Sequence, residues 1–449
     1  MILKNDFPAP VLDALNKLKE HNIDGYVVGG AVRDIIMGKT PSDYDITTSS
    51  SPEQNLKIFS DYKTFETGIR YGTITVIIEN LPIEITTFRT DGEYKNNRKP
   101  EDVKFSENIE EDLSRRDFTI NALAYSPSKG LVDLYDGRCD IEKKVIRAIG
   151  NPNERFKEDA LRILRALRFS SRLGFEIEEK TKKAIFENKN LLKNIAKERL
   201  REEFNGILMG KHAIKVLSDF RDIIAVFIPE ISPCFDFDQK SKYHINDVYT
   251  HILKALENAP DDLTVRLSVY FHDIAKPHAY TTDKYGFRHY KEHPDMGAEI
   301  ARSILKNLKY DNKTIKDVTT LIKYHDTIIS PDKKDVKRFL HLIGKELLDK
   351  LFAVKFSDCK GKPNNGGQRY EDAKNAESIM KEILMSGECF SLKMLNLNGD
   401  DLIQKKIPPH FIGEILNSCL NEVIQENIPN EKSALLKYAL DYYKNINHS

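Results

Sequence analysis

The sequence lacks an excess of charge of either sign. Its 449 residues include 69 lysines and arginines and 69 aspartates and glutamates, so the formal net charge is zero. Overall charge therefore does not indicate a nucleic-acid-binding protein, and any basic footprint must be a local patch. The chain is also too long for one ordinary hydrophobic core, and its length indicates about two to four domains.

Paired cysteines and long apolar runs are also missing. The five cysteines are scattered and form no CxxC motif, which indicates a reduced, intracellular protein without a structural zinc cluster. The N-terminal stretch MILKNDFPAPVLDALNKLKE soon becomes amphipathic, so neither a signal peptide nor a membrane-spanning helix is visible. We expect a cytoplasmic enzyme or binding protein with no membrane partner.

The chain changes character near residue 150. Before that point, β-rich runs such as GYVVGG, YGTITVIIE and PIEITTFR alternate with a few helical stretches, a pattern typical of an α/β or α+β domain. Afterwards the periodicity is almost entirely helical, with breaks at ISPCFDFDQKSKYH and CKGKPNNGGQRY. We predict an α+β fold in four parts, at residues 1–150, 151–235, 236–360 and 361–449.

The stretch GGAVRDIIMGKTPSDYD combines features of a phosphate site and a metal site. A strand that runs into Gly29 and Gly30 and then into a helix lets backbone amides approach an anion such as a triphosphate, although most glycine pairs are ordinary turns. Asp43 and Asp45 alternate along a β-like stretch, so both carboxylates face one side. A cation such as Mg²⁺ would relieve their repulsion, and solvated aspartates in a turn are the alternative.

Glu84 is a third candidate carboxylate. It lies in LPIEITTFR, a strand whose other residues are mostly apolar or β-branched, where an unpaired carboxylate is costly. Either a metal or a salt bridge to an arginine would explain it. Two metals held by three carboxylates would activate a hydroxyl nucleophile and stabilise a leaving pyrophosphate. With Asp43 and Asp45, Glu84 therefore predicts nucleotidyl transfer.

Six ordered motifs carry a resemblance to a known family. They are GGAVRD, SDYD, IEITTFR, SRRDFTINALAY, LVDLYDG and NPNERFKEDALRILRALRF. In this order they resemble the class II tRNA nucleotidyltransferase and bacterial poly(A) polymerase family, whose head is related to DNA polymerase β. The resemblance implies a mixed-sheet head with Mg²⁺ as cofactor, followed by an all-α neck and body.

The resemblance also implies roles for individual residues. Gly30 and Arg33 would contact the incoming triphosphate, with Gly29 beside them, and the two aspartates of SDYD would hold the metals. Arg116 and Asp117 would lie at the sugar and phosphate of the nucleotide. A carboxylate that accepts from a 2′-hydroxyl distinguishes ribose from deoxyribose, and an arginine neutralises phosphate charge. Without its neighbours, RRDF could equally be a surface ion pair.

The stretch EDALRILRALRF concerns base specificity. Asp159 and Arg162 are three residues apart and would share one helical face, where an intrahelical salt bridge is the alternative. Cytosine and adenine both place an amino donor beside a ring-nitrogen acceptor, so a carboxylate and an arginine would admit them and reject guanine and uracil. In the family, EDxxR has this template role. By the same resemblance Arg165 and Arg168 add nucleotide contacts, and KERLREEF, at 197–204, supports the neck without touching substrate.

The product needs separate evidence, because CCA-adding and poly(A) enzymes share these motifs. FRTDGEYKNNRKPEDVKF, at 88–105, resembles the flexible loop of full CCA-adding enzymes, and the neutral charge contrasts with basic poly(A) polymerases. We therefore predict template-independent addition of CCA to tRNA from CTP and ATP. A positive stripe would hold the acceptor and T arms of the tRNA. A poly(A) polymerase, an A-adding tRNA nucleotidyltransferase and a non-catalytic RNA-binding protein are the alternatives.

Histidine and aspartate residues in the third part predict a second chemistry. The candidate ligands are His251, His272, Asp273, His293, His325 and Asp358. Imidazole and carboxylate groups together can hold a divalent metal, although any one histidine alone would more often be a core or surface residue. In this order the segments resemble the HD superfamily of metal-dependent phosphohydrolases. The resemblance implies a second divalent metal, and either a scaffold role or hydrolysis of a 2′,3′-cyclic phosphate or 2′-nucleotide at a damaged RNA end.

Overall fold

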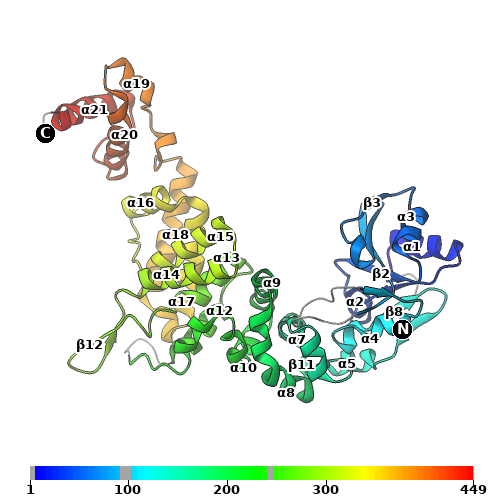
Figure 1. The fold of residues 1–449 in the computed structure, drawn as a ribbon. Coiled ribbons are helices and arrows are strands. Elements are labelled where there is room, and N and C mark those ends of the chain that lie inside the picture. The colour runs from blue at the N-terminus through cyan, green and yellow to red at the C-terminus, as the bar shows by residue number, and fades with distance from the viewer. Residues whose placement is uncertain (1–5, 92–102, 241–245, 448–449) are drawn as a thin grey trace. The chain divides into compact units, whose positions relative to one another are not determined.

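The computed structural model describes residues 6–91, 103–240 and 246–447. The chain divides into two compact units, Met1–Pro229 and Glu230–Ser449, coloured from blue to green and from green to red in Figure 1. The first unit contains a large mixed sheet, and the second is almost entirely helical. These features confirm the α+β fold, whereas the boundaries expected near residues 150 and 360 stay predictions.

Seven strands form the sheet of the first unit, in the order β3-β4-β5-β2-β1-β8-β9. Strands β2 and β5 run parallel, and the other neighbours run antiparallel. In β4, Ile74, Val76 and Ile78 are buried and alternate with half-buried residues, as expected for a two-residue period over a hydrophobic core. The strands are β1 (Gly25–Val28), β2 (Tyr44–Thr48), β3 (Lys63–Phe65), β4 (Thr73–Ile78), β5 (Leu81–Thr87), β8 (Leu123–Ser126) and β9 (Gly130–Asp133).

Helix α1 (Ala9–Glu20) packs against β1 and β4. Its buried residues Val11, Ala14, Leu15 and Leu18 recur at the spacing of one helical face. The other helices of this part are α2 (Gly30–Ile36), α3 (Pro52–Ile58), α4 (Ile109–Ser114) and α5 (Gly137–Lys143). Helix α3 begins with a capping box between Ser51 and Gln54, which satisfies backbone amides at its first turn.

The strands β6 (Arg89–Asp91) and β7 (Val103–Phe105) pair antiparallel. They lie at the two ends of the stretch predicted to be a flexible loop. Residues 92–102 of that stretch lie outside the described residues, so the loop itself stays a prediction.

The rest of the first unit is a set of helices that follows the sheet. They are α6 (Pro152–Glu158), α7 (Leu161–Leu173), α8 (Glu179–Asn188), α9 (Lys197–Leu208), α10 (Ala213–Asp219) and α11 (Arg221–Ile224). Helix α7 packs against α9. It buries Ile163, Leu164 and Leu167, while Arg165 and Arg168 are only half-buried. The apolar face of α7 therefore fixes the direction of its arginines. A short strand, β11 (Glu176–Ile177), pairs with β10 (Val145–Ile146), so strands do not end entirely at residue 150.

The second unit is built around packed helices. They are α12 (Val248–Glu257), α13 (Leu263–Phe271), α14 (His293–Asn307), α15 (Asn312–Tyr324), α16 (Lys333–Ile343), α17 (Lys345–Lys360), α18 (Gln368–Ser386), α19 (Gly399–Gln404), α20 (Pro409–Ile424) and α21 (Lys432–Asn447). Helix α13 packs on α15 and α17, and α12 packs on α17. A hairpin of β12 (Thr281–Thr282) and β13 (Arg288–His289) interrupts the helices. Among the described residues, no helix combines the length and apolar character needed to cross a bilayer.

Candidate active site and metal centre

Three carboxylates gather where β2 and β5 run side by side. Asp45 lies in β2 directly opposite Glu84 in β5, and its other neighbour across the sheet is Val28, the last residue of β1. Asp43 comes just before β2 and accepts a hydrogen bond of 2.7 Å from the Ser42 hydroxyl. The predicted grouping of Asp43, Asp45 and Glu84 therefore follows from strand register.

The charge balance of this group favours a bound cation. Burial, followed by repulsion from Glu84, raises the pKa of Asp45 to about 6, against the opposing effect of Arg116. Within the described residues, no cationic side chain lies within 4.0 Å of the carboxylate oxygens of Asp45 or Glu84. This donor set of carboxylate oxygens fits Mg²⁺. The argument that a buried Glu84 would be costly is wrong, however, because Glu84 is exposed; its position opposite Asp45 is what places it here.

The turn after β1 brings backbone close to this group. Gly29 has φ +70°, a conformation that favours glycine. A Cβ on Gly29 would also lie 3.0 Å from Nη1 of Arg116. Glycine at this position therefore allows both the turn and the close approach of Arg116.

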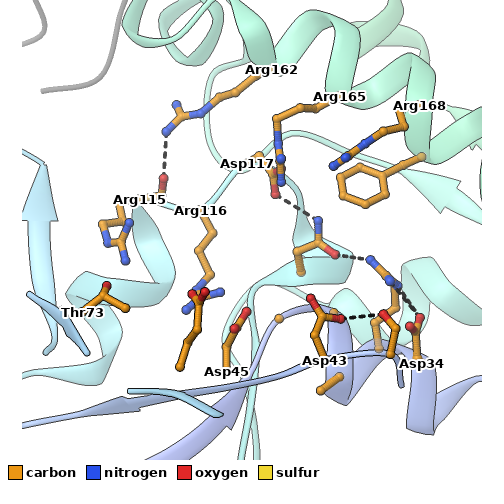
Figure 2. A pocket seen from close by; sticks show the side chains of 18 of the residues that line it. Asp34, Asp43, Asp45, Thr73, Arg115, Arg116, Asp117, Arg162, Arg165 and Arg168 are labelled. Carbon is orange, nitrogen blue, oxygen red and sulfur yellow. Dashed lines mark hydrogen bonds and ion pairs between the residues drawn. The ribbon is translucent and has the colours of Figure 1, made fainter. Parts of the chain in front are cut away.

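A chain of hydrogen bonds links Arg33 to helix α7 (Figure 2). Arg33 Nη1 donates to Asn121 Oδ1 (2.7 Å), Asn121 Nδ2 donates to Asp117 Oδ1 (3.0 Å), and Arg165 Nε donates to Asp117 Oδ2 (2.7 Å). Burial would raise the pKa of Asp117, but Arg165 and Asn121 outweigh it and lower that pKa. Asp117 is therefore ionised and orients Arg165.

Two residues that the sequence analysis missed organise the arginines of α7. The ring of Phe169 lies 5.4 Å from the guanidinium carbons of Arg33 and Arg165 and 5.1 Å from that of Arg168. Glu203, on α9, lies 3.0 Å from Arg168 Nε and 3.9 Å from Arg165 Nη1. A shared aromatic face and a shared carboxylate hold these cations together.

Asp159 and Arg162 do not share a helical face as predicted. Asp159 is extended, with φ −133° and ψ 103°, between α6 and α7, and its carboxylate pairs with Nη2 of Arg199 at 2.9 Å. Arg162 instead pairs with Glu158 at 2.6 Å. The helix is broken at Asp159, whose carboxylate accepts from the backbone N–H of Leu161. Arg199 belongs to KERLREEF, which was expected only to support the neck.

One cavity of about 990 Å³ collects the predicted residues of the first unit. Its lining includes Gly29, Gly30, Arg33, Asp43, Asp45, Glu84, Arg116, Asp117, Asp159, Arg162, Arg165 and Arg168. Phe169 and Arg199 line it as well. Figure 2 shows Asp34, Asp43 and Asp45 below and Arg162, Arg165 and Arg168 above, with Arg115, Arg116 and Asp117 between them. Opposite charges thus face each other across a volume suited to a small charged ligand.

The predicted metal ligands of the second unit also come together. His251 lies on α12, His272 and Asp273 follow α13, His293 begins α14, His325 ends α15, and Asp358 lies on α17. All six are buried. Helices α12, α14 and α17, together with the residues directly after α13 and α15, therefore supply side chains to one centre.

The four imidazoles face one another through the same nitrogen. All four Nδ1 atoms are hydrogen-bonded to backbone carbonyls, those of His272 to Val269 (2.7 Å), of His325 to Ile322 (2.6 Å), of His251 to Gly361 (3.4 Å) and of His293 to Tyr290. The Nε2 atoms of His251 and His272 are 3.3 Å apart, and those of His293 and His325 are 3.2 Å apart. When Nδ1 carries the proton, Nε2 is a lone-pair acceptor, so each pair repels unless a cation or proton lies between them.

Asp273 lies between the two imidazole pairs. Its Oδ2 is 3.4 Å from His251 Nε2 and 3.2 Å from His272 Nε2, while its Oδ1 is 3.3 Å from His293 Nε2 and 3.8 Å from His325 Nε2. Each triad, Asp273 with either histidine pair, has ligand atoms close enough to hold one metal ion. This donor set fits two divalent cations that share one carboxylate.

The charges of this centre are strongly coupled. Burial lowers the pKa of His272, but Asp273 and Asp358 outweigh it and raise that pKa to about 9. Burial and the neighbouring histidines lower the pKa of His325 to about 3. Two lysines complete the centre: Lys276 Nζ is 2.6 Å from Asp273 Oδ2, and Lys362 Nζ is 2.5 Å from Asp358 Oδ2. The centre is thus a buried cluster of polar and charged groups. Burying such groups without partners would destabilise the fold.

Comparison with known proteins agrees with the architecture of the first unit. The model for the poly A polymerase head domain matches residues 25–147, and that for a probable RNA and SrmB-binding site of polymerase A matches 174–235. A model described as tRNA nucleotidyltransferase domain 2, putative, matches 294–439. These descriptions do not name an HD domain, and the HD assignment stays a prediction. The mixed sheet, the paired carboxylates and the match to the head-domain model together define a nucleotidyltransferase.

Similar full-length proteins specify the family. The CCA-adding enzyme of Lactobacillus delbrueckii subsp. bulgaricus is 34% identical over 430 residues, covering 95% of this chain and 96% of that protein. That of Ligilactobacillus salivarius is 34% identical over 449 residues, with 98% of each chain covered. The Bacillus stearothermophilus CCA-adding enzyme in complex with CTP has a TM-score of 0.70 at 25% identity, covering 99% of this chain and 100% of that one. The chain belongs to the CCA-adding enzyme family.

Proposed function

We propose that this chain adds CCA to the 3′ end of tRNA from CTP and ATP, without a nucleic-acid template, and releases pyrophosphate. The observation that carries this proposal is the register of Asp45 opposite Glu84 in a cavity walled by arginines. The family supports it, and so does the complex of its Bacillus member with CTP. We assign the head to residues 1–150, the neck to 151–235 and the helical tail to 361–449, and we place the reaction in the cytoplasm.

The acidic side of the cavity would bind the metal. Asp43, Asp45 and Glu84 would hold Mg²⁺, which supplies activation of the attacking 3′-hydroxyl and charge neutralisation at the leaving pyrophosphate. Burial, followed by repulsion from Glu84, raises the pKa of Asp45, and a bound cation would relieve that repulsion. Within this group Asp45 and Glu84 are held on neighbouring strands, so their oxygens are positioned before substrate arrives.

The basic side would bind the triphosphate. Arg33, Arg165 and Arg168 lie around the ring of Phe169, and Arg116 lies beside Gly29. Guanidinium groups held in place by Asp117 and Glu203 present fixed donors to phosphate oxygens. These fixed cations would orient the nucleotide and stabilise the charge that develops in the transition state.

Asp159 and Arg162 would select the base, with Arg199 holding Asp159. The Asp159 carboxylate would accept from the amino group of cytosine or adenine, and Arg162 would donate to the ring nitrogen. In the structure Asp159 is paired with Arg199 and Arg162 with Glu158, so nucleotide binding would exchange part of these contacts for contacts with the base. This exchange would link base identity to the position of α9.

The test is extension of a tRNA transcript that ends at the discriminator base. The purified protein would be incubated with Mg²⁺ and the four nucleotides singly and together, and products would be resolved at single-nucleotide length. Growth by three residues that requires both CTP and ATP supports the proposal. A single added A or a long A tail would instead favour the alternative enzymes, and binding without extension would favour a non-catalytic RNA-binding protein.

A second activity is favoured by one specific observation, the convergence of four imidazoles on the two oxygens of Asp273. We propose that residues 236–360 form a metal-dependent phosphohydrolase of the HD type. His251, His272, His293, His325, Asp273 and Asp358 would hold two divalent metals, which would supply activation of water and charge neutralisation at a phosphoester. A 2′,3′-cyclic phosphate at an RNA end is the proposed substrate.

This activity is tested with an RNA oligonucleotide ending in a 2′,3′-cyclic phosphate. The protein would be loaded with Mn²⁺, Co²⁺, Ni²⁺ or Mg²⁺ in turn, and the product would be followed by chromatography. Ring opening that is lost in Asp273→Asn but retained in Asp45→Asn assigns the activity to the second unit. No ring opening with any of these metals would leave the centre a structural one.

A further inference from the structure

The β12–β13 hairpin projects from the helices of the second unit (Figure 1) and is rich in aromatic and basic side chains. Residues 280–291 read YTTDKYGFRHYK and contain three lysine or arginine side chains against one carboxylate, that of Asp283. The oxygens of Asp283 are used within the turn, because they accept from the N–H groups of Tyr285 and Phe287 at 2.9 and 3.0 Å and contact His289 Nε2 at 2.9 Å. The outward charge of the hairpin is therefore positive.

The tip of the hairpin exposes an aromatic ring. Tyr285 is 73% exposed, and Lys284 Nζ lies 5.0 Å from the centre of its ring. Burying this ring in the core would be favourable, yet the turn holds it in solvent with a cation beside it. An exposed ring next to a cation is the pairing that binds a nucleobase by stacking and its phosphate by charge.

The base of the hairpin is fixed to the metal centre. The guanidinium carbon of Arg288 lies 4.6 and 4.4 Å from the ring centres of Phe237 and Tyr280, which are themselves in contact, and Nη1 donates to the carbonyl of Asp238 at 2.7 Å. The Tyr290 hydroxyl donates to the carbonyl of Gln239 at 2.6 Å. The Tyr290 ring packs edge-on against the ring of His293, with centroids 6.4 Å apart. The hairpin therefore has a rigid connection to a proposed metal ligand.

We propose that this hairpin binds single-stranded RNA and presents its 3′ end to the HD centre. Tyr285 would stack on a base and Lys284 would contact the adjacent phosphate. The inference rests on the proposed phosphohydrolase activity and deepens it, because it makes an RNA chain, in place of a free mononucleotide, the preferred substrate. RNA is the polymer chosen because the proposed activity of the first unit acts on RNA 3′ ends.

The test compares two substrates of the full-length, Mn²⁺-loaded protein. One is an eight-nucleotide RNA ending in a 2′,3′-cyclic phosphate, and the other is a 2′,3′-cyclic mononucleotide. In Tyr285→Ala the ratio of kcat/KM for RNA to that for the mononucleotide should fall about tenfold or more, because KM for the RNA should rise. Tyr285→Phe keeps the stacking ring and should keep the ratio. Lys316→Ala, which removes an exposed lysine on α15, is the matched control.

The remaining outcomes are also decisive. An unchanged ratio in Tyr285→Ala overturns the proposal, and so does an equal loss on both substrates, which would indicate damage to the centre. If the wild-type protein hydrolyses neither substrate, the phosphohydrolase proposal fails, and the hairpin is judged by photocrosslinking to 4-thiouridine RNA. A crosslink within residues 280–291 that Tyr285→Ala removes then supports RNA binding, and its absence overturns it.

Discussion

Asp45 in β2 and Glu84 in β5 occupy directly opposed positions of a parallel strand pair. Burial, followed by repulsion from Glu84, raises the pKa of Asp45 to about 6. Neighbouring carboxylates on rigid strands repel each other in the absence of a cation, so the fold maintains this arrangement at a cost in stability. Such a cost is typical of a functional site.

Asp45→Asn should reduce tRNA extension by at least about a hundredfold, because it removes one oxygen ligand charge from the metal site. The measurement is the single-turnover rate of CMP addition at saturating CTP. Glu79→Gln, in the turn between β4 and β5, is the control and should leave the rate unchanged. A rate of Asp45→Asn close to that of the control would remove Asp45 from the catalytic set.

Much of this site could be predicted from short motifs. Asp43 and Asp45 lie close together in one motif, as do Gly29 and Gly30, and the antiparallel pairing of β1 with β2 brings the two motifs together by placing Val28 opposite Asp45. Glu84 was singled out because its neighbours in the strand are mostly apolar or β-branched, but its exposed position opposite Asp45 depends on strand pairing, which the sequence does not display.

Other contacts of the site depend on tertiary packing. Arg199 reaches Asp159 from 40 residues away, because α9 packs on α7. Helical periodicity places Arg199 and Glu203 on one face of α9 but does not say what that face meets. The break of the helix at Asp159 was missed for a different reason, because a local hydrogen bond from the Leu161 N–H to the Asp159 carboxylate competed with the helical pattern.

Arg199→Ala should weaken nucleotide selection. Without its partner the Asp159 carboxylate loses a fixed orientation, so KM for CTP and ATP should rise about tenfold with a smaller change in kcat, and discrimination against UTP should fall. Steady-state incorporation of each nucleotide measures both effects. Arg201→Ala on the same helix, which lies outside the cavity lining, should behave as wild type. A loss confined to kcat would contradict a positioning role for Arg199.

Phe169→Leu should raise KM for both nucleotides by roughly fivefold, because the aromatic face that holds Arg33, Arg165 and Arg168 is lost while a similar volume is kept. Phe169→Tyr keeps the ring and should restore the wild-type KM. The comparison is a nucleotide titration at fixed tRNA concentration. Equal KM values in all three proteins would show that the ring does not organise the arginines.

Glu388 predicts a pH-dependent contribution to the stability of the second unit. Hydrogen bonds from Lys333 and Lys337 lower its pKa to about 2 and tie the chain after α18 to α16. Folding lowers the pKa of Glu388 from its value of 4.5 in the unfolded chain. The stabilisation is therefore fully present above pH 4.5 and is lost as the pH falls towards 2. Because Glu388 is partly exposed, its ion pairs contribute only about 1 kcal/mol to the free energy of unfolding.

Urea unfolding at pH 7 and pH 3 measures this contribution. Glu388→Gln should be less stable than wild type at pH 7, and the difference should shrink at pH 3, where the Glu388 carboxyl of the unfolded wild-type chain is mostly protonated. Glu371→Gln, an exposed carboxylate at the start of α18, is the control. A difference that stays constant with pH would mean that the Glu388 charge does not stabilise the fold.

Asp273 predicts the metal content of the second unit. If its two oxygens serve two ions, Asp273→Asn should lose both, whereas His293→Gln, which alters only one triad, should lose one. The measurement is metal per chain by mass spectrometry after loading with Mn²⁺ and desalting, with circular dichroism to confirm folding. Asp295→Asn, an exposed carboxylate on α14 paired with Lys323, should keep both ions. Equal loss in Asp273→Asn and His293→Gln would indicate one ion bound by all the ligands together, and would contradict the shared carboxylate.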